Sequence, residues 1–264
     1  LRRTTAIHST KEPLSPSARV LFSLIVALPP VVGVVVPLIG LGIRLGEATT
    51  LRTFDPENLL QATTTTIGVS LAAALVALLL ALPLAALAAR HQRTWISTLE
   101  GAGYLSNGLP GIVVGLSLVF FSLSVVPSLY QTVVVLVFAY AVLFMPKALG
   151  TARASIEGVP ADLISVARTL GASRFEAWRR VTVPLALPGL GIGALLVAIA
   201  TMKELPATLL LRPLGSSTLA TELWSRTAAG EFGAAAPYAA VLVLIAAIPA
   251  MILSGVRSVA KEEM

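Results

Sequence analysis

Residues Ser165–Pro184 read S-V-A-R-T-L-G-A-S-R-F-E-A-W-R-R-V-T-V-P and lie between two long apolar stretches, residues 129–145 and 185–211. This basic segment is an exception in the chain, because 56% of the 264 residues are hydrophobic and only 12% are charged. A soluble domain carries roughly one quarter charged residues and could not bury so much apolar surface. A polar, arginine-rich segment between apolar runs is instead typical of a loop in a membrane protein.

On both sides of this loop, the chain contains six apolar runs in all, and each has the length that a helix needs to cross a bilayer, roughly twenty residues. Lipid offers no partner to the backbone groups of an open strand, and the runs show no alternation of polar and apolar residues. The predicted fold class is therefore all-α, a polytopic membrane helical bundle with six transmembrane helices. The predicted spans are Val20–Ile43, Leu59–Ala89, Gly108–Val126, Leu129–Met145, Leu185–Leu211 and Ala234–Ser254.

The distribution of lysine and arginine predicts the orientation of the spans. With the N-terminus in the cytoplasm, fourteen of the nineteen basic residues fall in cytoplasmic segments, as the positive-inside rule requires. Both termini and the arginine-rich loop are then cytoplasmic. The same excess of basic residues in cytoplasmic segments accounts for the net charge of +6. Nucleic acid is not expected as a partner, because no aromatic residues are interleaved with the basic ones.

The residues around the start of the loop predict a short helix. Pro160 suits the first turn of a helix, and Asp162 complements the dipole at that end. Gly171 suits a left-handed residue that ends the helix. So short a helix is not stable alone in water, so a partner is expected to fix it. Its apolar face would consist of Leu163, Ala167 and Leu170.

Two further features concern packing. The segment Ser173–Val181 is expected to form a second helix that lies at the membrane surface, with Phe175 and Trp178 on one face. The pairs Gly111-x3-Gly115 and Gly189-x3-Gly193 predict helices that approach one another closely, as packing in membranes favours.

The spacing of the loop, S-V-A, three residues, Gly171, nine residues and V-T-V-P, resembles the loop by which permease subunits of ABC importers dock onto their ATPase. The family pattern is E-A-A-x3-G-x9-I-x-L-P, so Ser165 stands where the family has Glu. The resemblance implies a permease in a bacterial cytoplasmic (inner) membrane, driven by separate ATP-binding cassette subunits. It implies a cytoplasmic coupling helix in a coupling loop, residues 150–184. The residues that it assigns to ATPase coupling are Asp162, Leu163, Ser165, Ala167, Arg168, Leu170, Gly171 and Pro184.

A second informative stretch, T-M-K-E-L-P-A-T-L-L-L-R-P at residues 201–213, ends the fifth predicted span. Placing the charged side chains of Lys203 and Glu204 in an apolar membrane segment costs free energy unless they face a cavity, one another or the headgroups. Two interpretations stay open. Both side chains reach the outer headgroups, or they line the outer mouth or gate of a translocation path, with Pro206 breaking the helix beside them. Asn107 is a further polar residue that would line the path or cap a helix.

This stretch, together with T-L-A-T-E-L-W at residues 218–224, resembles the ferric-iron-type importer permeases. Permeases for thiamine, phosphonates and other small solutes share parts of it. The resemblance implies that an extracytoplasmic substrate-binding protein delivers the solute, with ferric iron as the first candidate. The chain has no cluster of Tyr, His or carboxylate residues that resembles a ferric site, so neither a resident metal nor a cofactor is expected.

The ends of the chain leave a question open. Residues 1–19 are polar and are expected to form a cytoplasmic linker, with the six-helix permease domain over residues 20–264. One interpretation is a trimmed or processed stand-alone subunit, and the other is the second half of a longer polypeptide with two six-helix repeats. A second permease half, as a twin subunit or a fused repeat, is expected as a partner in both cases.

Other classes of function find little support in the residues. The chain lacks the G-x4-G-K-[ST] pattern of a P-loop, so an enzyme that hydrolyses ATP is not predicted. It has no cysteine, and its two histidines lie in polar flanks. An ion-gradient-driven transporter, the less favoured alternative, would place acidic or histidine residues near the middle of the spans. A non-transporting membrane scaffold is the third possibility, and deleting it would leave the uptake of every solute unchanged.

Overall fold

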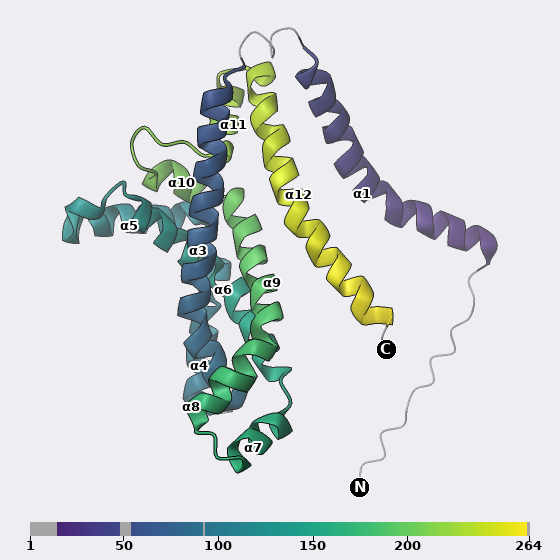
Figure 1. Ribbon diagram of the computed structural model, residues 1–264. Coiled ribbons are helices and arrows are strands. Elements are labelled where there is room, and N and C mark those ends of the chain that lie inside the picture. The colour runs from purple at the N-terminus through teal and green to yellow at the C-terminus, as the bar shows by residue number, and fades with distance from the viewer. Residues whose placement is uncertain (1–14, 48–53, 92, 263–264) are drawn as a thin grey trace.

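The computed structural model describes residues 15–47, 54–91 and 93–262, and in these ranges the regular elements are all helices. This confirms the all-α membrane bundle. The elements are α1 (Pro16–Leu45), α3 (Pro56–Arg90), α4 (Thr94–Gly103), η1 (Leu105–Gly108), α5 (Gly111–Val125), η2 (Pro127–Leu129), α6 (Val133–Glu157), α7 (Ala161–Thr169), α8 (Arg174–Ala177), η3 (Trp178–Thr182), α9 (Val183–Met202), α10 (Pro206–Leu211), α11 (Leu219–Ala228) and α12 (Phe232–Glu262). Helices α3, α6 and α9 run side by side, α12 packs on α11 and contacts α3 and α9, and α1 packs on α12 (Figure 1).

Small side chains form the core between α3, α6 and α9. The buried face of α3 is a stripe of alanines at helical spacing, and Leu149 and Ala152 of α6 are fully buried against it. Lipid tails are as apolar as the protein interior, so an apolar side chain gains little free energy by moving from lipid into the bundle. Close backbone approach and van der Waals contact therefore hold such helices together. The stripe consists of Ala73, Ala74, Ala77, Ala81, Ala85 and Ala88.

The glycine pairs lie where helices meet, which confirms the predicted close approach. A Cβ added at Gly189 would collide with the Ser155 hydroxyl of α6, and one added at Gly193 would collide with the Thr151 hydroxyl. A Cβ at Gly115 of α5 would lie 3.1 Å from the Ala207 Cα of α10. These contacts leave no room for a larger residue.

The third predicted span, Gly108–Val126, corresponds to α5, and the chain bends sharply just before this helix. The chain forms α4, turns through the 3₁₀ helix η1, and continues as α5 at an angle of 104°. Pro110 is the N-cap of α5, where its ring prevents the preceding turn from continuing into the helix. Figure 1 shows α5 lying across the direction of α3 and α6 rather than alongside them. The predicted span is therefore the second part of a bent pair, because α5 has 15 residues and passes as a span only together with the segment Thr94–Gly108.

The fifth predicted span differs at both ends. The helix ends at Met202 instead of Leu211, and α10 begins anew at Pro206 after a break of three residues. At its other end the helix extends back through the π-helical turn η3 to Arg174, because residues 174–202 form one continuous helical segment. The separate surface helix predicted for Ser173–Val181 is thus the first part of this segment. The capping box between Ser173 and Glu176 starts it.

In the part of the chain that the structure describes, five helices are long and apolar enough to cross a membrane, or six if the bent pair α4 and α5 counts as one span. Helix α1 has no buried residue, and three prolines within it, Pro29, Pro30 and Pro37, accompany its bend in Figure 1. Residues 16–19, assigned to the linker, are the first turn of α1, where Ser15 accepts a hydrogen bond from the Ala18 N–H. The rest of the predicted linker, residues 1–14, lies outside the described residues.

Candidate functional site

The predicted coupling loop lies at one end of the bundle, where α6 ends and the segment leading into α9 begins (Figure 1). Helix α6 continues to Glu157, so the irregular part starts at Gly158 rather than near residue 150. Pro160 is the N-cap of α7, and Asp162 lies in its first turn. Gly171 has φ +91°, the left-handed conformation that the sequence predicts after the helix. The short helix and its glycine stop are confirmed as structure.

Helix α7 presents apolar side chains to its surroundings. Leu163 and Val166 are exposed, and Leu170 is 82% exposed, while Ile164 and the buried Val159 before α7 belong to the bundle core. A nine-residue helix with this much exposed apolar surface is marginal in water unless another surface covers it. The geometry therefore suits a docking element.

Between α7 and the bundle lies a hollow of about 360 Å³. Of the predicted coupling residues, Ser165 and Arg168 line this hollow, and Leu163 and Leu170 are exposed beside it on α7 and its C-cap. Pro184 lies apart from it, in the first turn of α9. The full lining is Arg90, Ala161, Ile164, Ser165, Arg168, Arg174, Trp178 and Thr182.

Charged groups anchor the base of the loop to neighbouring helices. Arg90, at the end of α3, donates from Nη2 to the Ile156 carbonyl at 3.2 Å and to the Val159 carbonyl at 3.5 Å. A guanidinium at the C-terminal end of α6 also complements the helix dipole. Arg153 forms ion pairs with Glu157 on its own helix and with Glu100 on α4. Sequence reasoning missed Glu100, and its position within an otherwise apolar segment is the only signal that could have found it.

The second predicted site lies around the break between α9 and α10. Lys203 is exposed and forms the C-cap of α9. Glu204 is half-buried, and its Oε1 accepts a hydrogen bond from the Ala207 N–H at 3.1 Å, so it caps α10. The same carboxylate faces Gly111 of α5. Pro206 begins α10, as a helix-starting proline would. The structure therefore brings Glu204 to α5.

Asn107, the remaining predicted path residue, lies in η1 between α4 and α5 and is exposed. Its N–H donates to the Tyr104 carbonyl at 3.1 Å within that turn. The residue thus lies at the bend that separates the two halves of the third span.

Buried hydroxyl groups lie next to the break, and sequence reasoning did not single them out. Tyr140 of α6 is 2% exposed, and its hydroxyl is hydrogen-bonded to Thr208 of α10. Thr208 donates its only hydroxyl hydrogen to the Glu204 carbonyl, so Tyr140 must be the donor in their bond. On α3, Thr66 accepts a hydrogen bond from the Leu219 N–H at 2.9 Å. These bonds fix α10 and the start of α11 against the bundle.

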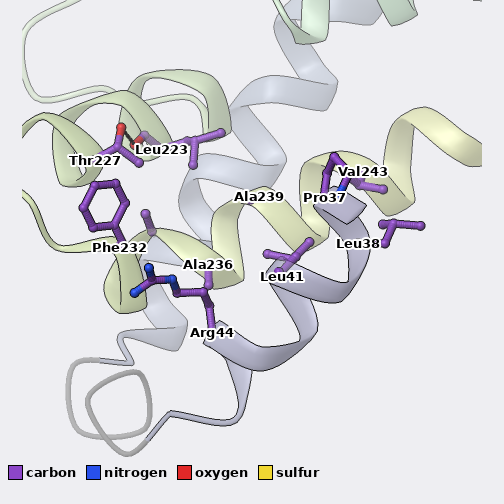
Figure 2. Close-up of a pocket in the computed structure, with 12 residues that line it drawn as sticks. Pro37, Leu38, Leu41, Arg44, Leu223, Thr227, Phe232, Ala236, Ala239 and Val243 are labelled. Carbon is purple, nitrogen blue, oxygen red and sulfur yellow. Dashed lines mark hydrogen bonds between the residues drawn. The ribbon is translucent and has the colours of Figure 1, made fainter. Parts of the chain in front are cut away.

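A hollow of about 360 Å³ lies between α1, α11 and α12, and Figure 2 shows the residues that line it. Its walls are mostly aliphatic, and the Arg44 guanidinium lies over the Phe232 ring, 5.3 Å from the ring centroid. No set of polar groups converges there. We interpret this hollow as loose packing of α1 on α12 and assign no chemistry to it.

The fold is thus a bundle of apolar membrane helices with a short, largely exposed helix, α7, at one end. The chain belongs to the family described as binding-protein-dependent transport system inner membrane component, which matches residues 81–257. An Fe(3+)-transport system permease protein of Haemophilus influenzae is 39% identical over 180 residues, which cover 68% of this chain and 36% of that protein.

Two further relatives are named for other solutes. A molybdate/tungstate transport system permease protein of Thermococcus kodakarensis is 30% identical over 161 residues, covering 61% of this chain and 64% of that protein. A protein of Salmonella typhimurium named for 2-aminoethylphosphonate transport is 30% identical over 159 residues, covering 60% and 58%. The matched region thus spans about a third of the Haemophilus relative and about three fifths of the other two.

Proposed function

We propose that the chain is the permease of an ABC importer, with ATP hydrolysis on a separate ATPase subunit and solute delivered by an extracytoplasmic binding protein. The observation that carries this proposal is α7, a short helix ended by Gly171 at φ +91°, which leaves Leu163 and Leu170 exposed at one end of the bundle. Membership of the binding-protein-dependent transport family supports it. In this proposal α7 is the coupling helix, and the loop and both termini lie in the cytoplasm.

The proposed coupling contact would combine a fixed base with an exposed tip. Arg90 and Arg153 tie the end of α6 to α3 and α4, so a movement of α7 would be transmitted to the bundle through packed helices rather than through an unanchored loop.

At the far end of α9, Glu204, Lys203 and Pro206 mark the break that we propose as the outer gate. Glu204 is suited to this because it caps α10 and faces α5 at once.

We propose ferric iron as the solute. The residues 201–213 resemble ferric-iron-type permeases, and the Haemophilus relative is named for Fe(3+) transport. Relatives named for molybdate/tungstate and 2-aminoethylphosphonate make a small oxyanion or phosphonate the alternative, and thiamine follows from the sequence resemblance alone.

We propose that a second six-helix half completes the path. The region matched in the Haemophilus relative is 36% of that protein, which leaves room in it for another unit of this size. This supports the fused arrangement, and a twin subunit remains the alternative form of the same partner.

Uptake of radiolabelled ferric iron tests the proposal. Cells that express the permease with its ATPase and binding protein should take up iron, and Gly171→Trp should abolish uptake with the protein level in the membrane unchanged. Gly171→Asn is the matched control, because asparagine tolerates the left-handed conformation. If the wild type takes up no iron, ferric iron is excluded as the solute, and the same assay should then be run with molybdate, phosphonates and thiamine. Full uptake in the tryptophan variant would contradict the coupling role.

A further inference from the structure

The hollow beneath α7 has an excess of positive charge. Three of its eight lining residues are arginines, Arg90, Arg168 and Arg174, and none of the eight is acidic. Its floor is apolar, with Ile164 and the Trp178 ring. A concave surface of this kind suits a group that is negatively charged at its tip and apolar behind it.

The positive charge is not neutralised from within the loop. Asp162 is the carboxylate nearest Arg168 in sequence, but it does not line the hollow. Glu176, the carboxylate nearest Arg174, accepts from the Ser173 N–H at 2.9 Å and lies 3.8 Å from Arg180. Among the described residues, neither Arg168 nor Arg174 takes part in an ion pair. Arg90 is occupied by two backbone carbonyls, which solvate its charge without cancelling it.

Ser165 lines the hollow without adding charge to it. The docking-loop pattern has Glu at this position, and a glutamate there would place a carboxylate in the wall of the hollow beside the arginines. Ser165 instead turns its hydroxyl back to the Ala161 carbonyl at 3.1 Å, within its own helix. In this chain the wall of the hollow therefore carries no carboxylate at position 165.

We propose that this hollow receives an acidic side chain of the ATPase subunit. The inference rests on the proposed function and adds the chemistry of the contact. A carboxylate that enters between Arg168 and Arg174 would form charge-assisted hydrogen bonds with both guanidinium groups. An anionic lipid headgroup would match the charge, but it would leave the exposed Leu163 and Leu170 at the end of the bundle in water. A protein surface covers both features at once.

Binding of the ATPase subunit encoded with this permease tests the inference, with the permease in nanodiscs of phosphatidylcholine. We expect the double variant Arg168→Gln, Arg174→Gln to bind the ATPase roughly tenfold more weakly, because charged hydrogen bonds are lost. Its affinity should also depend less on salt between 50 and 500 mM. Ser165→Glu should weaken binding similarly, since its own carboxylate would occupy the arginines. Arg179→Gln is the matched control, because Arg179 is exposed on the same segment and does not line the hollow.

The outcomes separate the two proposals. If the double variant and the control bind the ATPase as the wild type does, with the same salt dependence, the acidic contact is wrong and the permease function stands. If the double variant differs from the wild type only in nanodiscs that contain phosphatidylglycerol, the occupant is a lipid headgroup and the inference is overturned. If the wild type binds no ATPase in either lipid, both the inference and the proposed function fail.

Discussion

Arg153 of α6 forms an ion pair with Glu100 of α4, although 53 positions separate them in the chain. Glu100 is 9% exposed, and the same guanidinium donates from Nε to Glu157 at 2.8 Å. One side chain therefore joins α4, which leads into the bend before α5, to the end of α6, which leads into the docking helix. Removing one partner of a buried pair leaves the other charge poorly solvated, which costs more than losing an exposed pair.

Glu100→Gln should destabilise the protein by about 1 to 3 kcal/mol, less than for a fully buried pair because Arg153 is partly exposed. Glu157→Gln is the matched control, since it removes an exposed pair on one helix and should cost about 0.5 kcal/mol or less. Thermal unfolding of both variants in the same detergent measures the difference. Equal losses would mean that the Glu100 pair contributes no more than a surface pair.

Gly171→Ala should impair ATP-dependent uptake through backbone strain alone. A Cβ at this position meets nothing within 4 Å, but the residue has φ +91°. A non-glycine residue in the left-handed region costs about 1 to 2 kcal/mol, so α7 should be less well ordered. Gly191→Ala, where a Cβ also meets nothing within 4 Å and no positive φ is needed, should leave uptake unchanged. Equal uptake in both variants would show that the turn tolerates the strain.

Gly115→Ala should destabilise the contact between α5 and α10. The new Cβ would lie 3.1 Å from both the Ala207 Cα and the Leu210 Cδ1, and the backbone atom cannot rotate away. Overpacking of this kind costs about 1 to 3 kcal/mol. The comparison is with Gly191→Ala, which should be neutral or stabilise its helix by up to about 1 kcal/mol. Unfolding midpoints of the two variants measure this, and a neutral Gly115→Ala would mean that α5 moves freely.

Tyr140→Phe and Thr208→Val should show a coupling energy of about 1 kcal/mol in a double-mutant cycle. Both residues are buried, and their hydroxyl groups are bonded to one another. Tyr140→Phe removes the donor, while Thr208→Val also removes the bond to the Glu204 carbonyl. Chemical unfolding of the four proteins gives the cycle. Strictly additive losses would show that the bond between the two hydroxyl groups does not contribute.

Several features of the fold follow from the sequence because they depend on local properties. The long apolar runs have to be helical in lipid, and Gly171 ends α7 because glycine takes a left-handed conformation at low cost. The glycine pairs predicted close helix contacts, since no other side chain leaves as much room. The loop helix was found for the same reason, because Pro160, Asp162 and Gly171 are signals that act within a few residues.

Other features were misjudged because hydropathy does not report direction. The run Gly108–Val126 was predicted as a span and forms α5, but α5 lies at 104° to the preceding segment Thr94–Gly108 and packs on α10. A helix break at Pro206 was one of the interpretations of the sequence, but the predicted span continued to Leu211, because residues 205–211 are as apolar as the helix before them; the helix ends at Met202 and Pro206 begins α10. In both places the chain changes direction and packs against another helix. The hydropathy of a residue is the same whichever direction the chain takes, so it cannot predict the change.

The sequence by itself determined that this chain is a bundle of membrane helices with a short helix ended by Gly171, because solvent preference and backbone conformation belong to single residues and their neighbours. Only the tertiary structure decided which polar groups meet: Glu100 with Arg153, Tyr140 with Thr208, and three arginines around one hollow. A buried polar group needs a partner at hydrogen-bonding distance, but helices from distant parts of the chain supply that partner. Their rotation and offset are set by the packing of the whole bundle.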